Sequence, residues 1–221
     1  DPSRLFEASG SAGKICVFAV RLDTFEKIPS QVFYVGTNTQ QDLTAIRRFL
    51  LKDLPRLPIA GEYIHRVAYD IGAEYGKDTF MFIEKFGTAR VPAAFAMKDK
   101  VDGYLEKIHM KGWSDKFLQL MTRFLPHHLP KRMTEFRDLY EHHLILRIEN
   151  QDVERVQHFL AQYFAANTTG SYFLCDEDEG RKAFLHRFAV AGAAIRYRDT
   201  HRSVVADIVA LDIALRRNDN E

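Results

Sequence analysis

The sequence lacks the features of disulfide-rich, redox-motif and membrane-spanning proteins. Its 221 residues include two cysteines, Cys16 and Cys175, which lie too far apart in the chain to form a CxxC pair. The longest apolar stretch, residues 188–195, is less than half of the roughly 20 residues that cross a bilayer. We therefore expect a reducing compartment and no transmembrane helix.

The short motifs of several enzyme classes are also missing. The chain contains no GxGxxG, Walker or GxSxG motif, which argues against nicotinamide, nucleoside-triphosphate and serine-hydrolase chemistry. Its nine histidines include the adjacent pairs His127-His128 and His142-His143, but none has the His-x-x-x-His spacing of a helical metal site. Neighbouring residues on a strand point to opposite faces, so His142 and His143 cannot serve one site there. We predict no metal site.

Positive charge is concentrated in one segment. The 31 lysines and arginines nearly balance the 30 acidic residues, so the net charge of +1 gives no overall attraction to nucleic acid or anionic lipid. Residues 77–140, however, hold twelve basic and eight acidic residues, a balance of +4, whereas the segments before and after carry 0 and −3. All five methionines and the single tryptophan lie in the same segment.

Adaptable apolar side chains beside cations are typical of surfaces that contact a membrane without crossing it. The candidate membrane-contacting residues are Lys107, Lys111, Trp113 and Lys116. The alternative is that the methionines and phenylalanines build a small core with the lysines outside.

Two stretches of the chain alternate extended runs with helical periodicity. The expected strands are residues 14–22, 31–36, 59–64, 142–148 and 171–175. Two expected helices are defined by apolar faces, the first of Leu43, Ile46, Phe49 and Leu50 and the second of Val153, Val156, Phe159, Leu160 and Phe164. Two further helices are expected at residues 67–75 and 179–194. We predict an α+β fold in which two β-α-β units form one ferredoxin-like sheet, interrupted by a largely helical basic insertion. The alternative is two unrelated α/β pieces.

Arg187 is a candidate binding residue. It precedes the small-residue stretch 188–194 on the last expected helix. A guanidinium at the edge of a close-packed helix can hold a small carboxylate through two parallel hydrogen bonds. The alternative is a structural arginine paired with one of the acids at 176–179.

Several long segments resemble one enzyme family. They are DPSRLFEASGSAGK, VFAVRLDTFE, AGEYIHR, YGKDTF, YEHHL, KAFLHRFAVAGAAIRY and ALDIALRRND. These segments resemble the quinone-dependent respiratory D-lactate dehydrogenases, which are FAD flavoproteins of the vanillyl-alcohol-oxidase type. The resemblance runs essentially from end to end.

The resemblance implies a division into domains. Residues 1–23 correspond to the end of the FAD-binding domain, and residues 24–76 and 141–221 to the two halves of the cap. Residues 77–140 correspond to the membrane-binding domain. An alternative assigns residues 179–200 to this domain as well, rather than to the cap.

The resemblance also implies roles for individual residues. The backbone at Val17, and secondarily at Ile15, is expected to lie beside the flavin of FAD. Arg187 is expected to hold the substrate carboxylate, because its stretch keeps the arginine of a W-x-x-R-E-like motif. Phe184 and Phe188 replace the Trp and Glu of that motif.

The function implied is FAD-dependent oxidation of D-lactate to pyruvate, with electron transfer to membrane quinone. The expected partners are D-lactate, quinone and an anionic lipid surface, at the cytoplasmic face of the bacterial inner membrane, to which the enzyme binds peripherally. Because the chain opens at Asp1-Pro2 without an initiator methionine, we expect a fragment of a longer protein that is inactive alone.

A different function remains as the alternative, although we predict no nucleic-acid partner. A ferredoxin-like binding module could contact nucleic acid through its basic insertion. RNA binding on such a sheet uses exposed aromatics, which one member of the pair Phe33 and Tyr34 and one of the pair Tyr172 and Phe173 would provide.

Overall fold

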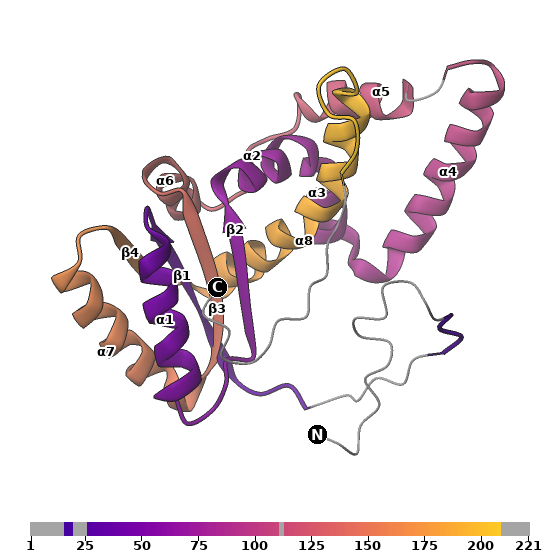
Figure 1. Cartoon of the computed structure of the whole chain (residues 1–221). Helices are drawn as coiled ribbons and strands as arrows, with labels where there is room; N and C mark the ends of the chain where they lie inside the picture. The colour runs from indigo at the N-terminus through magenta and orange to yellow at the C-terminus, as the bar shows by residue number, and fades with distance from the viewer. Residues whose placement is uncertain (1–15, 20–25, 111–112, 209–221) are drawn as a thin grey trace.

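The computed structural model describes residues 16–19, 26–110 and 113–208 (Figure 1). The strands are β1 (Ser30–Thr37), β2 (Ala60–His65), β3 (His142–Glu149) and β4 (Gly170–Leu174). The helices are α1 (Gln40–Lys52), α2 (Arg66–Tyr75), α3 (Lys77–Phe86), the short 3-10 helix η1 (Thr88–Arg90), α4 (Val91–Lys107), α5 (Trp113–Thr122), α6 (Lys131–Leu139), α7 (Asn150–Ala166) and α8 (Glu177–Thr200).

The four strands form one sheet in the order β2-β3-β1-β4, with every neighbouring pair antiparallel. Phe33 of β1 lies opposite Leu146 of β3 on one side and Leu174 of β4 on the other. The two β-α-β units are thus interleaved in a single sheet, as in the ferredoxin-like split motif. The predicted α+β fold is confirmed, and the alternative of two unrelated pieces is wrong.

Helices cover both faces of this sheet. On one face, α1 and α7 pack against Phe33 and Val35, whereas α2, α6 and α8 lie on the face that carries Tyr34 and Ile145 (Figure 1). Six consecutive residues of β1 are therefore buried, which explains why its sequence is a continuous apolar run rather than an alternating one.

This double cover corrects the expectation of an exposed aromatic platform. Phe33, Tyr34 and Phe173 are all buried, and Tyr172 packs against the core under α7. A base cannot stack on rings that helices already cover, so the sheet does not offer the surface that the nucleic-acid alternative requires.

The segment 77–140 is largely helical, as predicted, but only its middle projects from the body. Phe80 of α3 and Met133 of α6 are fully buried in the same core as Tyr34 and Ile145. By contrast, α4 has no buried residue and extends away from the sheet (Figure 1). The two ends of the segment therefore help to build the body, and α4 and α5 carry its exposed part.

The predicted strand at 14–22 is wrong at residues 16–19, the part of it that the structure describes. Residues 16–19 have no regular secondary structure, and the sheet ends at β2 and β4 without including them. An extended segment needs a neighbouring strand to satisfy its backbone N–H and C=O groups, and none in the described part of the chain pairs with these residues.

Three buried histidines lie between the sheet and its helical cover. They are His143 of β3, His186 of α8 and His128, which precedes α6; neither ring nitrogen of any of them makes a hydrogen bond within the described residues. His143 and His186 both pack against the ring of Tyr69. Burial lowers the pKa of His128 and His143 to about 4 and that of His186 to about 3.

These low pKa values predict acid-sensitive stability. The unfolded chain protonates its histidines near pH 6.5 and the folded chain only near pH 3–4, so stability falls as the pH falls through this window. Between pH 7 and pH 5 the free energy of unfolding should drop by about 2 kcal/mol for each buried histidine. Urea unfolding at the two pH values measures this drop.

The variant His143→Phe should show a smaller drop, because an apolar ring suits the aromatic surroundings and does not titrate. His158→Phe, at an exposed position of α7, is the matched control and should keep the full drop. An equal drop in both variants would contradict the assignment.

Candidate functional site

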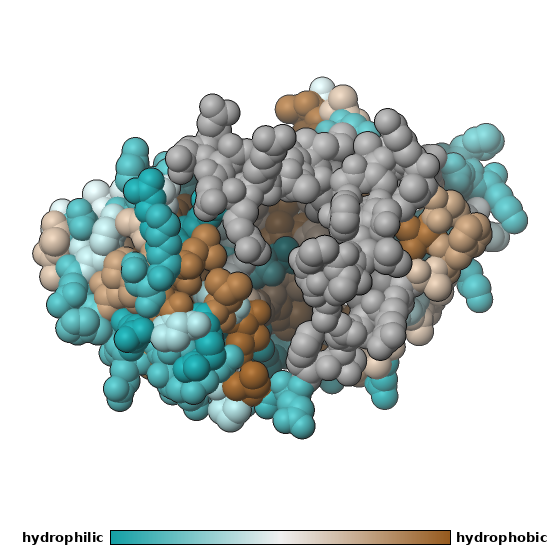
Figure 2. All heavy atoms as spheres, turned by 60° about the horizontal axis from the view of Figure 1, so that its bottom comes forward, coloured by the Kyte–Doolittle hydropathy of each residue, from teal (hydrophilic) through white to brown (hydrophobic). Residues whose placement is uncertain are grey.

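A group of large apolar side chains lies exposed on the projecting helices. Figure 2 shows brown and pale-brown side chains at the right of the view, the side on which α4 lies in Figure 1, and a second brown group left of the centre. We call the exposed large apolar residues of the segment 86–124 the apolar surface; they are Phe86, Phe95, Met97, Val101, Tyr104, Ile108, Trp113, Phe117, Leu120, Met121 and Phe124. Exposed apolar patches of this kind mark sites that contact membranes or other proteins.

Helix α5 gives this surface its clearest pattern. Trp113, Phe117 and Leu120 follow one another at helical spacing and are 55%, 61% and 51% exposed. Lys116 lies on the same side and is also exposed. The opposite side of α5 carries the buried Thr122, so the helix presents its apolar stripe outward rather than to the core.

The charges of this segment are divided between two environments. Asp78 and Glu84 of α3 pair with Arg196 and Arg181 of α8, which takes these carboxylates out of the local balance. Six exposed cations make no ion pair among the described residues: Lys85, Arg90, Lys100, Lys107, Lys116 and Arg123. Asp99 and Glu106 of α4 are also exposed, so the outward charge of this segment is positive but does not exceed the +4 of its composition.

A buried ionic network holds the projecting helices to the body. Arg196, which is 9% exposed, places Nη1 2.7 Å from Asp78 Oδ1 and 3.0 Å from the carbonyl of Tyr75. Its Nε lies 3.5 Å from Asp115 Oδ1 of α5, and Asp115 Oδ2 accepts from Lys98 Nζ of α4 at 3.1 Å. One aspartate thus connects three helices.

Lys98 completes the network through Asp102 of α4, 2.7 Å from its Nζ, and the Ser114 hydroxyl donates to the same carboxylate. Burial alone would lower the pKa of Lys98, but its hydrogen bonds to Asp102 and Asp115 outweigh burial and raise it. The pKa of Asp102 is lowered, because these hydrogen bonds exceed the opposing effect of burial. Both partners therefore remain charged at neutral pH.

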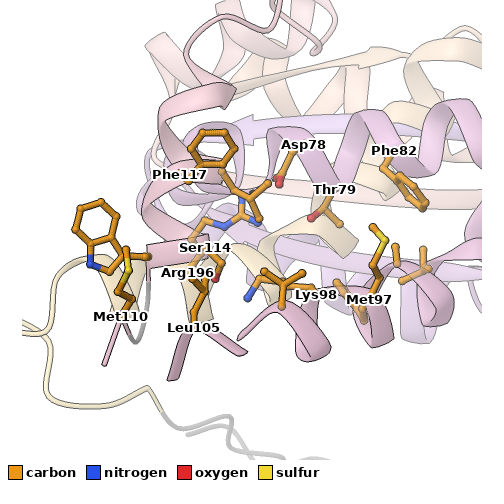
Figure 3. A pocket seen from close by; sticks show the side chains of 16 residues that line it. Asp78, Thr79, Phe82, Met97, Lys98, Leu105, Met110, Ser114, Phe117 and Arg196 are labelled. Carbon is orange, nitrogen blue, oxygen red and sulfur yellow. Dashed lines mark hydrogen bonds and ion pairs between the residues drawn. The ribbon is translucent and has the colours of Figure 1, made fainter. Parts of the chain in front are cut away.

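A cavity of about 610 Å³ lies between α3, α4 and α5 (Figure 3). Its walls are mostly apolar and include Phe82, Leu105 and Phe117. In Figure 3, Asp78 and Arg196 are directed toward each other at one side of this space. The cavity therefore has a polar end within apolar walls.

The candidate membrane-contacting residues fall on or beside this surface. Trp113 and Lys116 belong to the α5 stripe, and Lys107 is exposed in the last turn of α4. Lys111 lies outside the described residues. The methionines divide between the two predicted roles, because Met133 is in the core while Met97 is 68% exposed.

The predicted flavin contact at Val17 falls on an irregular segment. Val17 is 50% exposed within residues 16–19, and neither the cavity between α3, α4 and α5 nor the one beside β1 and α8 includes it among its lining residues. Ile15 lies outside the described residues. The predicted flavin contact thus gains no support from this part of the chain.

Arg187 forms an ion pair that the sequence did not predict. Its Nε lies 2.8 Å from Glu62 Oε2 on β2, and about half of its side chain is exposed. The alternative that paired it with an acid at 176–179 is wrong, because those residues precede it by two or more turns and the guanidinium reaches across to the sheet instead. Its role toward substrate stays a prediction.

Sequence reasoning missed the network of Arg196, Asp78 and Asp115. The last helix was expected to end at 194, before Arg196, and nothing in the spacing of these residues indicated that they meet. The described part of the chain contains no helix long and apolar enough to cross a bilayer.

Comparison with known proteins shows which family the chain resembles. The family model described as D-lactate dehydrogenase, membrane binding, matches residues 32–221. The quinone-dependent D-lactate dehydrogenases of Escherichia coli (strain K12) and Haemophilus influenzae are 52% and 51% identical to the whole chain, which covers 39% and 40% of their lengths. That of Corynebacterium glutamicum is 44% identical over 99% of the chain and 39% of the relative. The chain spans about two fifths of the length of these curated relatives.

The ionic network predicts how the projecting helices can be loosened. Asp115→Asn removes the charge that connects Lys98 and Arg196, and should lower the free energy of unfolding by about 1–3 kcal/mol. Amide hydrogen exchange should accelerate in α4 and α5 more than in the sheet. Asp99→Asn, at an exposed position of α4 without an ion pair among the described residues, should change neither. Uniform acceleration across sheet and helices would show that the network does not act locally.

Proposed function

The chain belongs to the membrane-binding family of D-lactate dehydrogenases, and on this premise we propose that its apolar surface rests on the lipid bilayer. The contact combines shallow insertion with electrostatic attraction, and no part of it crosses the membrane. The observation that carries the proposal is the outward stripe of Trp113, Phe117 and Leu120 with Lys116 beside it.

Electrostatic attraction comes from the exposed cations that make no ion pair within the described part of the chain. Each cation close to an anionic bilayer contributes about 1 kcal/mol. Lys100 and Lys107 are seven residues apart on the outer side of α4, with the exposed Tyr104 between them. An interfacial aromatic flanked by lysines is the arrangement expected at the headgroup level.

Insertion supplies the part of binding that salt does not screen. Charge attraction falls off within a Debye length of about 8 Å at physiological salt, but burial of apolar side chains among acyl chains does not depend on ionic strength. Tryptophan suits the boundary, because its ring is apolar and its N–H can still reach water or a headgroup.

We propose for the intact protein the reaction that its relatives' names indicate. It oxidises D-lactate to pyruvate and passes electrons to membrane quinone, with FAD as the cofactor and with most of the FAD site outside this chain. The backbone at Val17 and Ile15 adjoins the flavin there. The enzyme binds peripherally at the cytoplasmic face of the bacterial inner membrane, and the chain alone is inactive.

Within that enzyme, Arg187 binds the carboxylate of D-lactate. The exposure of its side chain supports this role, because the guanidinium is accessible to a ligand, whereas its ion pair with Glu62 competes with a substrate carboxylate. Substrate would then replace or share the position that Glu62 occupies.

Retention on anionic vesicles tests the membrane contact. The double variant Lys107→Gln/Lys116→Gln should weaken retention at low salt by about 2 kcal/mol, at about 1 kcal/mol per cation. The control Arg48→Gln/Lys52→Gln removes the same charge from exposed positions of α1 and should leave retention unchanged. Equal retention of the two double variants at every salt concentration would refute the placement of the contact.

The role of Arg187 is tested in the full-length enzyme. Arg187→Lys keeps the charge but loses the planar fork, so kcat/KM for D-lactate should fall by an amount equivalent to about 1.5–3 kcal/mol. A lysine at this position can still pair with Glu62, so a purely structural role predicts no loss. Normal flavin content and thermal stability, measured alongside, exclude a folding defect.

A further inference from the structure

We propose that the cavity between α3, α4 and α5 binds the head of a neutral, carbonyl-bearing amphiphile, the class to which quinones belong. This inference rests on the proposed function, because the cavity opens on the surface that we place against the bilayer. It adds a specific ligand site to what is otherwise a surface contact.

The cavity has the size and lining of a small-molecule site. Its volume of about 610 Å³ lies within the range of roughly 300–1,000 Å³ that such sites occupy. Phe82, Val91, Leu105 and Leu118 form apolar walls from three helices. These walls favour an apolar occupant over water, because a water molecule needs two to four polar partners.

One buried donor in this cavity makes an ion pair but no hydrogen bond. Arg196 lines the cavity and is only 9% exposed, and its Nε, 3.5 Å from Asp115 Oδ1, makes no hydrogen bond among the described residues. A buried N–H without an acceptor is unfavourable, so an acceptor oxygen of a ligand would complete the site. Figure 3 shows Arg196 between Phe117 and Leu105, where such an oxygen would meet apolar side chains on either side.

The local charges select a neutral acceptor. Asp78, Lys98 and Arg196 line the cavity, and two further carboxylates outside its lining, from Asp102 and Asp115, pair with these cations, so three acids surround two cations. This excess of negative charge opposes a fatty-acid carboxylate or a phosphate at the polar end. A quinone carbonyl is uncharged and accepts a hydrogen bond, so it meets both requirements.

The mouth of the cavity provides an exit for an apolar tail. Phe95, Met97, Trp113 and Phe117 line the cavity and are at the same time about half exposed or more. A ligand whose head reaches Arg196 would therefore leave its chain among the residues that we place at the lipid interface. The relatives that match this chain are quinone-dependent enzymes, which supplies a source for such a ligand.

Trp113 allows binding to be measured without vesicles. It is the single tryptophan and lines the cavity, so quenching of its fluorescence reports on a nearby quinone ring. A decyl-substituted benzoquinone titrated into the 221-residue chain should quench this fluorescence with saturation, and equilibrium dialysis should give the same affinity. Palmitate should not compete.

Matched variants on α4 locate the site. Ala94 lines the cavity, whereas Ala96 is exposed and does not. Ala94→Phe should fill the space and weaken quinone binding about tenfold or more, while Ala96→Phe should leave it unchanged. Ala94→Leu should have an intermediate effect, and it keeps the test valid if the larger side chain disturbs folding.

The polar end has its own test. Arg196→Lys keeps a cation beside Asp78 but removes the Nε–H, so quinone affinity should fall about threefold to tenfold. Circular dichroism confirms that each variant remains folded.

The outcomes separate this inference from the proposed function. Vesicle retention with no saturable quinone binding, or with equal affinity in the Ala94→Phe and Ala96→Phe variants, would overturn the site and leave the membrane contact standing. Competition by palmitate would overturn the neutral class of ligand. If quinone binding saturates and only the cavity variants weaken it, but vesicles do not retain the chain, the cavity site is supported and the proposed membrane contact is wrong.

Discussion

The ion pair between the buried Arg196 and the partly buried Asp78 is the contact on which the arrangement of the projecting helices depends. Arg196 is on α8, which packs along the sheet, and Asp78 is on α3, where the chain begins to leave it. Through Asp115 the same guanidinium approaches α5, and through Lys98 the network reaches α4. The apolar residues of α4 and α5 bury little of their own surface, so this polar network, rather than a hydrophobic core, fixes their direction.

The same pairing explains how a segment of modest net charge can present a positive surface. Four of its eight acids pair with arginines of α8 or with Lys98, whereas six of its cations stay exposed without an ion pair among the described residues. These cations outnumber the exposed acids of α4, Asp99 and Glu106, so an anionic surface would still attract the segment. Apolar side chains exposed among these cations then allow attraction and insertion at one place.

The sequence correctly predicted the strands and helices whose apolar residues recur at a regular spacing. The run at 31–36 and the helix faced by Ile46 and Leu50 lie where patterning placed them, because burial against a sheet imposes a regular spacing. The charge and methionine content of 77–140 likewise pointed to the surface that α4 and α5 expose. Patterning could not show that helices cover both faces of the sheet, nor that Arg187 reaches Glu62, because both depend on contacts between residues distant in sequence. The cavity arises in the same way, from helices brought together by Arg196.

The depth of Trp113 in the bilayer shows whether α5 inserts into the membrane surface. Vesicles whose lipids carry bromine at a defined depth along the acyl chain quench a tryptophan only when it lies close to that depth. Shallow insertion of α5 predicts strong quenching by bromines near the headgroup, weak quenching by bromines at the bilayer centre, and an increase in quenching from zwitterionic to anionic vesicles. If vesicles retain the chain but no brominated lipid quenches the emission of Trp113, α5 lies away from the membrane and the proposed contact is wrong.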